Sequence, residues 1–154
     1  MGVVTWSPLA SGFLTGKYRK GQPIDLTTGR ASINPNRFDP SIPENAAKLD
    51  VVEQLIEVAA DLGCSLPELA VAFPAVHPAV TSVITGPRTM QQLEATLKGA
   101  ALTLDDSALD RIDGIIPPGT NLYQPDGAWR RPALTCSAAR RRPATDRAAF
   151  PQVV

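Results

Sequence analysis

The sequence has few cysteines, few aromatic residues and no long apolar run. Its two cysteines, Cys64 and Cys136, are far apart and form no Cys-x-x-Cys pattern. This argues against a disulfide framework or a zinc site and favours a reducing compartment. No apolar stretch reaches the roughly 20 residues that cross a bilayer, and the first residues lack the charged segment of a signal peptide. We therefore expect a cytoplasmic protein with neither a membrane partner nor a metal site.

The chain also lacks an excess of charge of either sign. Fifteen Lys and Arg balance fifteen Asp and Glu among 154 residues, and the pI is near 6.6. The overall charge gives no reason to expect a nucleic-acid partner. Basic residues are nevertheless concentrated late in the chain, where residues 140–142 are three consecutive arginines. No aromatic stacking pattern accompanies them, so we interpret them as part of a solvated tail.

Two short segments rich in β-branched residues predict buried strands. They are residues 3–6, which end at a Ser-Pro pair, and residues 81–84, which end at Thr-Gly-Pro. Residues 9–40 are polar and contain many glycines and prolines, which predicts a long loop. Loops of that length in a compact domain usually have a function or are disordered.

Four helices are expected after residue 40, each beginning with the same signal. A hydroxyl residue at the N-cap is followed three residues later by an acid or amide, so that the two side chains can satisfy free backbone donors. This pattern starts at Ser41, Ser65, Thr89 and Thr103. Pro74 predicts a kink or an early end to the second helix. Leu93 and Leu97 are expected to point inward from the third.

The order of these elements is strand, two helices, strand, two helices. Such an order predicts a parallel sheet with right-handed crossovers, buried on both faces. Two strands are too few to form that sheet alone. The sequence therefore favours a piece of a larger α/β barrel or layered sheet.

Both predicted strands run into glycine-containing turns. The second of these turns leads directly into a helix N-terminus and carries Arg88. Free backbone N–H groups and the positive end of a helix dipole favour a phosphate at such a place. On the pattern alone, glycines that only form turns and an Arg88 exposed to solvent are an equally good explanation.

Five segments in combination resemble the C-terminal part of an aldo-keto reductase of the branch related to potassium-channel β-subunits. They are VVTWSPLASGFLTGKY (3–18), GRAS (29–32), LGCSLPELAVAF (62–73), VTSVITGPRTMQQLEATL (80–97) and LDDSALDRID (104–113). The resemblance implies an α/β fold in which the strands are the last two of an incomplete (β/α)8 TIM barrel. Residues 1–122 would be the partial barrel and residues 123–154 an irregular tail rich in proline and arginine.

The same resemblance implies that residues 7–18 and 85–96 bind NADP(H). Trp6 would stack on the nicotinamide. The turn that begins at Ser7 would hold the pyrophosphate, with Lys17 as its counter-charge. Arg30 and Arg88 would face the 2′-phosphate, and Gln92 and Thr96 would contact the adenine. The full set of expected cofactor-binding residues is Trp6, Ser7, Pro8, Leu9, Ser11, Lys17, Arg30, Gly86, Arg88, Gln92 and Thr96.

The family's catalytic Tyr, Lys, Asp and His come from the first half of the barrel, and no residue here matches them. His77 is interpreted as a loop histidine before a strand. One hypothesis is therefore the cofactor-binding portion of an NADP(H)-dependent oxidoreductase that reduces small carbonyl compounds, with its catalytic half missing. The other is a non-catalytic NADP-binding or interaction module, or gene remnant, that pairs through exposed sheet edges.

Overall fold

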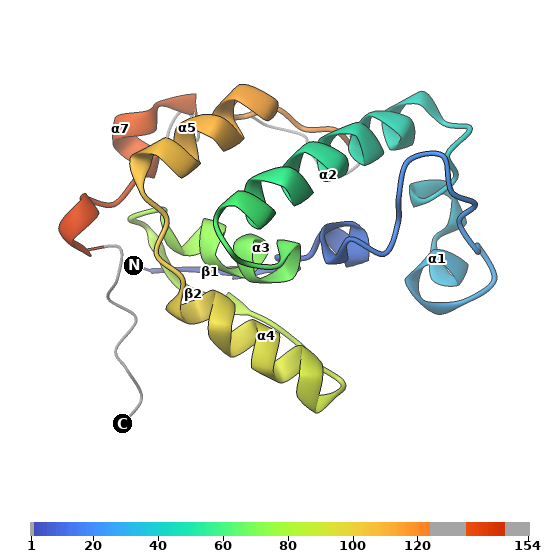
Figure 1. The fold of residues 1–154 in the computed structure, drawn as a ribbon, viewed down its shortest axis with the longest axis horizontal. Helices are drawn as coiled ribbons and strands as arrows, with labels where there is room; N and C mark the ends of the chain where they lie inside the picture. The colour runs from blue at the N-terminus through green and yellow to red at the C-terminus, as the bar shows by residue number, and fades with distance from the viewer. Residues whose placement is uncertain (1, 124–134, 147–154) are drawn as a thin grey trace.

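The computed structural model describes residues 2–123 and 135–146 as a set of helices and a two-stranded sheet (Figure 1). The strands are β1 (Val3–Trp6) and β2 (Val80–Ile84). The longer helices are α2 (Pro43–Asp61), α3 (Leu66–Ala75), α4 (Met90–Ala101) and α5 (Asp106–Ile115). Shorter helical segments are η1 (Ala10–Thr15), α1 (Gly29–Ile33), η2 (Pro35–Arg37), α7 (Ser137–Arg140) and η4 (Ala144–Asp146). None of the helices in these residues is long and apolar enough for a membrane crossing.

The sheet is parallel, as the order of elements predicts. Val4 lies opposite Ser82 and Trp6 opposite Ile84, with an irregularity in register between Val3 and Val4. α3 packs against β2 and against α4. The fold is therefore α/β, and the carboxyl ends of both strands meet at one edge.

The prediction that the strands are buried is wrong. Trp6 is 80% exposed, and Val4 and Ile84 are each 55% exposed. Among the residues of β1 and β2, only Val80 is buried, at 6% exposure. Contact from α3 covers too little of the sheet to bury either strand. A pattern of β-branched residues shows what a strand can bury, and the rest of the chain decides whether it does so.

The hydrophobic core instead lies among the helices and the segments that flank them. Phe13, Tyr18 and Phe38 form an aromatic cluster in which the rings of Phe13 and Phe38 stack with their centroids 4.9 Å apart. Aliphatic residues of α2, α3 and α5 extend this core, among them Leu49, Val52, Leu69, Leu109 and Ile112.

Two of the four predicted helix starts are confirmed. Ser65 forms a full capping box with Glu68, and the Thr89 hydroxyl accepts a hydrogen bond from the Gln92 N–H. The starts at Ser41 and Thr103 are wrong. α2 begins at Pro43 after an Ile42 N-cap, and α5 begins after Asp105, whose carboxylate accepts the Ala108 N–H. An Asp two residues after Thr103 offers a stronger acceptor for those backbone donors.

Other expectations about the helices have mixed outcomes. α3 ends at Ala75, one residue after Pro74, which confirms the early end. Residues 9–40 contain η1, α1 and η2 rather than one long loop. Leu97 is 60% exposed, so its inward placement is wrong. α4 reaches α3 through Gly99, where an added Cβ would lie 2.7 Å from the Glu68 carbonyl oxygen, and this close approach fixes which face is covered.

The three consecutive arginines do not form a solvated tail. The side chains of Arg140 and Arg141 are only 9% and 12% exposed. Arg140 pairs with Asp113, and Arg141 pairs with Asp113 at 2.5 Å and with Asp110 at 2.8 Å. We call residues 137–142 the C-terminal latch, because they fasten the end of the described chain to α5.

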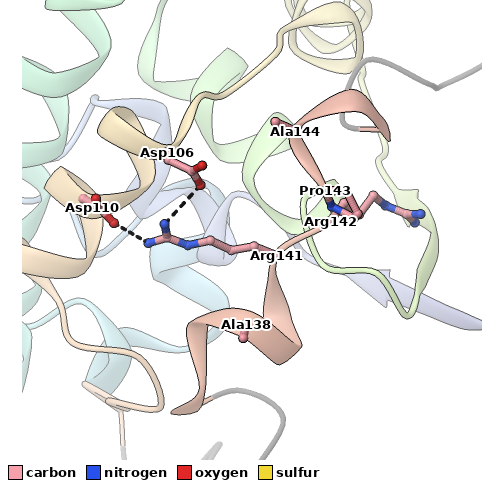
Figure 2. Close-up of a pocket in the computed structure, with 7 residues that line it drawn as sticks. All are labelled: Asp106, Asp110, Ala138, Arg141, Arg142, Pro143 and Ala144. Carbon is pink, nitrogen blue, oxygen red and sulfur yellow. Dashed lines mark hydrogen bonds and ion pairs between the residues drawn. The ribbon is translucent and has the colours of Figure 1, made fainter.

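The latch also connects the end of α3 with the start of β2. Arg142 donates from Nε to the Ala75 carbonyl at 3.1 Å and from Nη2 to the Val80 carbonyl at 2.5 Å. Figure 2 shows Arg141 extending towards Asp106 and Asp110, while Arg142 points the other way. The sequence missed this arrangement, because charge spacing within the tail does not reveal acids elsewhere on α5. The rest of the predicted tail, residues 124–134 and 147–154, lies outside the described residues.

Candidate functional site

The candidate site lies where both strands end. We call residues 7–16 the first turn and residues 85–89 the second turn. Because Trp6 pairs with Ile84, the two turns leave the sheet at the same edge. Figure 1 shows η1 and the start of α4 on the same side, to the right of the strands. Ligands of parallel α/β sheets bind at this edge, beyond the carboxyl ends of the strands.

The first turn has an unusual backbone. Ser7, Ala10 and Ser11 have φ values of 55°, 46° and 59°, and Gly12 follows at 108°. The left-handed region costs roughly 1–2 kcal/mol for a residue with a Cβ. Such strain is concentrated at ligand-binding and catalytic sites, where the surrounding structure maintains it. The glycines were visible in the sequence, whereas nothing in it marked Ala10 and Ser11 as left-handed.

Contacts inside the molecule hold this turn in place. Phe13 is buried in the aromatic cluster. The Thr15 hydroxyl donates to the Gly12 carbonyl at 2.7 Å, and the Gly12 N–H donates to the Leu9 carbonyl at 2.8 Å. The turn is therefore shaped before any ligand arrives.

Two cations lie against the first turn. Lys17, which the sequence singled out, is exposed and has its Nζ 4.5 Å from the centre of the Tyr18 ring. Arg37, which the sequence did not single out, donates from Nη1 to the Ser11 hydroxyl oxygen at 3.3 Å. Arg37 belongs to no motif, and 26 residues separate it from Ser11, so no local pattern could have pointed to it.

The segment after Lys17 is tied to α2 by an ion pair. Arg19 binds both carboxylate oxygens of Glu53, at 2.6 and 2.8 Å, and the Lys20 N–H donates to the same carboxylate at 3.0 Å. The hydrogen bonds from Arg19, followed by that from Lys20, lower the pKa of Glu53 from 4.5 to about 2. The Glu53 carboxylate is therefore ionised at physiological pH.

The predicted residues of the second turn form a local network. Gln92 Oε1 accepts the Arg88 N–H at 2.8 Å, and the Thr96 hydroxyl donates to the Gln92 carbonyl at 2.8 Å. Gly86 and the Arg88 side chain are exposed. The structure thus brings Arg88, Gln92 and Thr96 together at the start of α4. Their contacts with an adenine or a 2′-phosphate stay a prediction.

Arg30 stands apart from the other predicted residues. It lies on α1 and is exposed, and within the described chain no hydrogen bond or ion pair joins it to them. α1 follows a turn in which Asp25 accepts from Thr27 and Thr28.

His77 has the structural place that the sequence predicted. It lies between α3 and β2, and its Nδ1 accepts the Ala79 N–H at 3.1 Å. That is the end of β2 away from the two turns. Within the described parts of the chain, no group of three or more His, Cys, Asp or Glu residues is placed to bind a metal.

The fold and this edge define a class, an α/β protein whose two parallel strands end in neighbouring glycine-containing turns. The family model described as "Aldo/keto reductase family" matches residues 1–117, and the chain belongs to this family.

Curated relatives agree with this assignment. A protein of Oryza sativa subsp. japonica named "Probable voltage-gated potassium channel subunit beta" is 34% identical over 137 residues, covering 80% of this chain and 39% of its own length. One of the same name from Arabidopsis thaliana is 35% identical over 125 residues, covering 75% and 35%. "Uncharacterized oxidoreductase YrpG" of Bacillus subtilis is 34% identical over 120 residues, covering 77% and 33%. The chain therefore spans between a third and two-fifths of the length of these relatives.

Proposed function

We propose that this chain is the NADP(H)-binding C-terminal portion of an oxidoreductase that reduces carbonyl compounds. The observation that carries the proposal is the strained first turn, held at the carboxyl end of β1 beside a second turn that bears an arginine. Family membership supports it. In this reading β1 and β2 are the last strands of a (β/α)8 barrel, and two free thiols, Cys64 and Cys136, fit a cytoplasmic location.

The residues at this edge suit a dinucleotide with several phosphates. The hydroxyls and backbone of Ser7, Pro8, Leu9 and Ser11, with Lys17 beside them, would bind the pyrophosphate. Trp6, which is 80% exposed, offers an indole face on which the nicotinamide would stack. Once bound, the nicotinamide supplies the hydride of the reduction. The protein's own task is to bind and orient that ring.

The far end of the cofactor would lie on α1 and α4. A guanidinium binds phosphate through two parallel hydrogen bonds, and Arg30 and Arg88 both have exposed side chains. Gly86 allows the backbone of the second turn to approach the ligand closely. Gln92 and Thr96, one helical turn apart, would contact the adenine.

A second candidate is a non-catalytic module, and the exposed sheet favours it. β1 and β2 present apolar side chains, Val4 and Ile84 among them, that the described chain does not cover. Two strands with unpaired edges invite another chain to add strands. Under this proposal the partner is a second copy of the chain or the remainder of a barrel. Binding of NADP(H) alone does not separate the two candidates.

Turnover by this chain alone tests an expectation that the two candidates share. The described tyrosines are unsuited to the family's proton donor, because Tyr18 is buried in the aromatic cluster and Tyr123 lies beneath Arg37 and Lys48. We expect no reduction of an activated aldehyde by this chain alone. General acid–base assistance contributes about 10²–10⁴ in rate. Turnover that disappears in Tyr18→Phe or Tyr123→Phe would overturn this assignment.

A binding titration tests the cofactor site itself. NADPH should quench the fluorescence of Trp6, and a Trp6→Phe variant controls for the second tryptophan, Trp129. Arg88→Ala should weaken binding of 2′-phospho-ADP about tenfold or more, since a charge-assisted hydrogen bond contributes about 1.5–3 kcal/mol. Binding of ADP should stay nearly unchanged. Equal losses for both ligands would remove Arg88 from the 2′-phosphate site, and absence of NADPH binding would contradict the proposal.

A further inference from the structure

The first turn has a support that the proposed function does not include. Arg37 comes from η2, directly before the core residue Phe38, and donates to the hydroxyl oxygen of Ser11. Ser11 is one of the strained residues of the turn, with φ at 59°. Arg37 is half-buried, so its hydrogen bond is less exposed to competition from water than a surface contact.

The guanidinium of Arg37 is itself fixed by its neighbours. Its Cζ lies 4.5 Å from the centre of the Tyr123 ring, and the Nζ of Lys48 lies 4.1 Å from the same ring. Lys48 donates to the Arg37 carbonyl at 3.2 Å, so α2 also fixes the backbone of Arg37. The side chain therefore presents its donor to Ser11 in a defined direction.

A buried amide completes this support. Asn45 is 1% exposed, and its side-chain NH2 donates to the carbonyls of Asn36 and Asp39, both at 2.8 Å. Its Oδ1 accepts from Lys48 at 2.7 Å. These bonds hold the residues on both sides of Arg37. The network joins α2 and η2 to Ser11, one of the strained residues of the turn.

We infer that Arg37 is a positioning residue that sets the direction of the Ser11 hydroxyl for an anionic ligand. A serine hydroxyl has one proton to donate and two lone pairs that accept. Because Arg37 donates into one lone pair, the O–H of Ser11 points away from the guanidinium, towards the open side of the turn. A phosphate oxygen bound there receives that proton as a hydrogen bond. The ligand in question is the pyrophosphate, so the inference rests on the proposed function.

The affinity test uses the full chain titrated with NADPH. Arg37→Gln should weaken binding about tenfold, the loss of one hydrogen bond to a charged group. Ser11→Ala should weaken binding by a similar factor, and the double variant should bind no worse than the weaker single variant. Arg37→Lys should fail to restore affinity, because an ammonium lacks the planar fork that stacks on Tyr123. Arg111→Gln, a second arginine that is paired with α2 through Asp61, is the matched control and should stay within twofold.

A second measurement does not depend on the ligand. Amide hydrogen exchange in residues 9–16 of the ligand-free protein should accelerate several-fold in Arg37→Gln, and exchange in the middle of α2 should not change. Arg37→Lys keeps the charge and supplies a second variant if Arg37→Gln does not fold.

The two measurements separate the inference from the proposed function. Wild-type protein that fails to bind NADPH while Arg37→Gln accelerates exchange would overturn the proposed function and leave the positioning role of Arg37 supported. Unchanged exchange, or losses of affinity that add in the double variant, would overturn the inference alone.

Discussion

The helical side and the strand side of this chain contain similar apolar residues in opposite environments. Phe38 and Leu109 are at most 1% exposed among the helices, whereas Trp6 and Val4 on β1 are more than half exposed. The core cluster of the described residues takes no member from either strand. The difference shows that the helices of this chain are stabilised by contacts with one another. The sheet, in contrast, is largely exposed and is contacted mainly by α3.

This asymmetry places the candidate site on the boundary between the two sides. The first turn begins at the exposed end of β1 and passes through Phe13, which lies inside the core. Its shape therefore depends on the helical side even though the ligand would lie on the strand side. Variants that separate the two contributions are the most informative.

The largest difference should come from removing one aromatic ring on each side. Phe38→Ala should lower the free energy of unfolding by about 3–5 kcal/mol, because the ring stacks on Phe13 in a fully buried place. Trp6→Ala removes a larger side chain but should change stability by less than about 0.5 kcal/mol. Chemical denaturation of both variants measures the pair. Similar losses would mean that the strand side is covered in solution, for example by a second copy of the chain.

The next effect concerns the close packing of α4 on α3. Gly99→Ala would place a methyl group 2.7 Å from the Glu68 carbonyl oxygen and 3.0 Å from Val71. The overpacking should cost about 1–3 kcal/mol. Gly114→Ala in α5 is the matched control, because nothing lies within 4 Å of its new Cβ. It should stabilise the chain by up to about 1 kcal/mol through helix propensity. Equal behaviour of the two variants in thermal unfolding would show that α4 is free to shift.

The C-terminal latch extends the comparison to electrostatics. Arg141→Gln should cost about 1–2 kcal/mol, since the largely buried guanidinium pairs with Asp110 and Asp113. Arg111→Gln removes an exposed pair with Asp61 and should cost less than about 0.5 kcal/mol. Unfolding measured at low and high salt checks both variants. A negligible effect of Arg141→Gln would indicate that the latch is open in solution.

The smallest expected effect is a dependence of stability on acid pH. The pKa of Glu53 is about 2 in the folded chain, below its ordinary 4.5. A lowered carboxyl pKa stabilises the folded state above the unfolded pKa, and this contribution is lost as the pH falls from about 4.5 to about 2. With Arg19 41% exposed, it should not exceed about 1 kcal/mol. Glu53→Gln should remove this part of the acid dependence in denaturation curves, and an unchanged pH profile would contradict the assignment.

Local patterns predicted the elements better than their environments. The Ser65 capping box and the turns after the strands follow from residues close together in sequence, and the parallel pairing follows from the order of the elements along the chain. The exposure of β1 and of Leu97 does not, because burial depends on what the whole chain places against a side chain. A helix start can be misplaced for a local reason, as at Thr103, where Asp105 supplies the better N-cap acceptor.

The candidate site divides in the same way. The sequence identified Ser11, Arg88 and their turns, which the structure brings to one edge of the sheet. It did not identify Arg37 or the latch, whose contacts join residues between 26 and 67 positions apart. Interactions at that separation are products of the fold and leave no periodic signal in the sequence.

The pairing of β1 with β2 has a consequence for how the chain folds. Val4 pairs with Ser82, so α2 and α3 must be synthesised before the first strand has its partner. Parallel pairing between residues so far apart in sequence costs a large loop-closure entropy before any contact forms, and this slows folding. Until β2 is synthesised, the edge of β1 that pairs with it is available to other chains. Refolding rates should depend on α3, because its packing brings β2 to the place where β1 can dock.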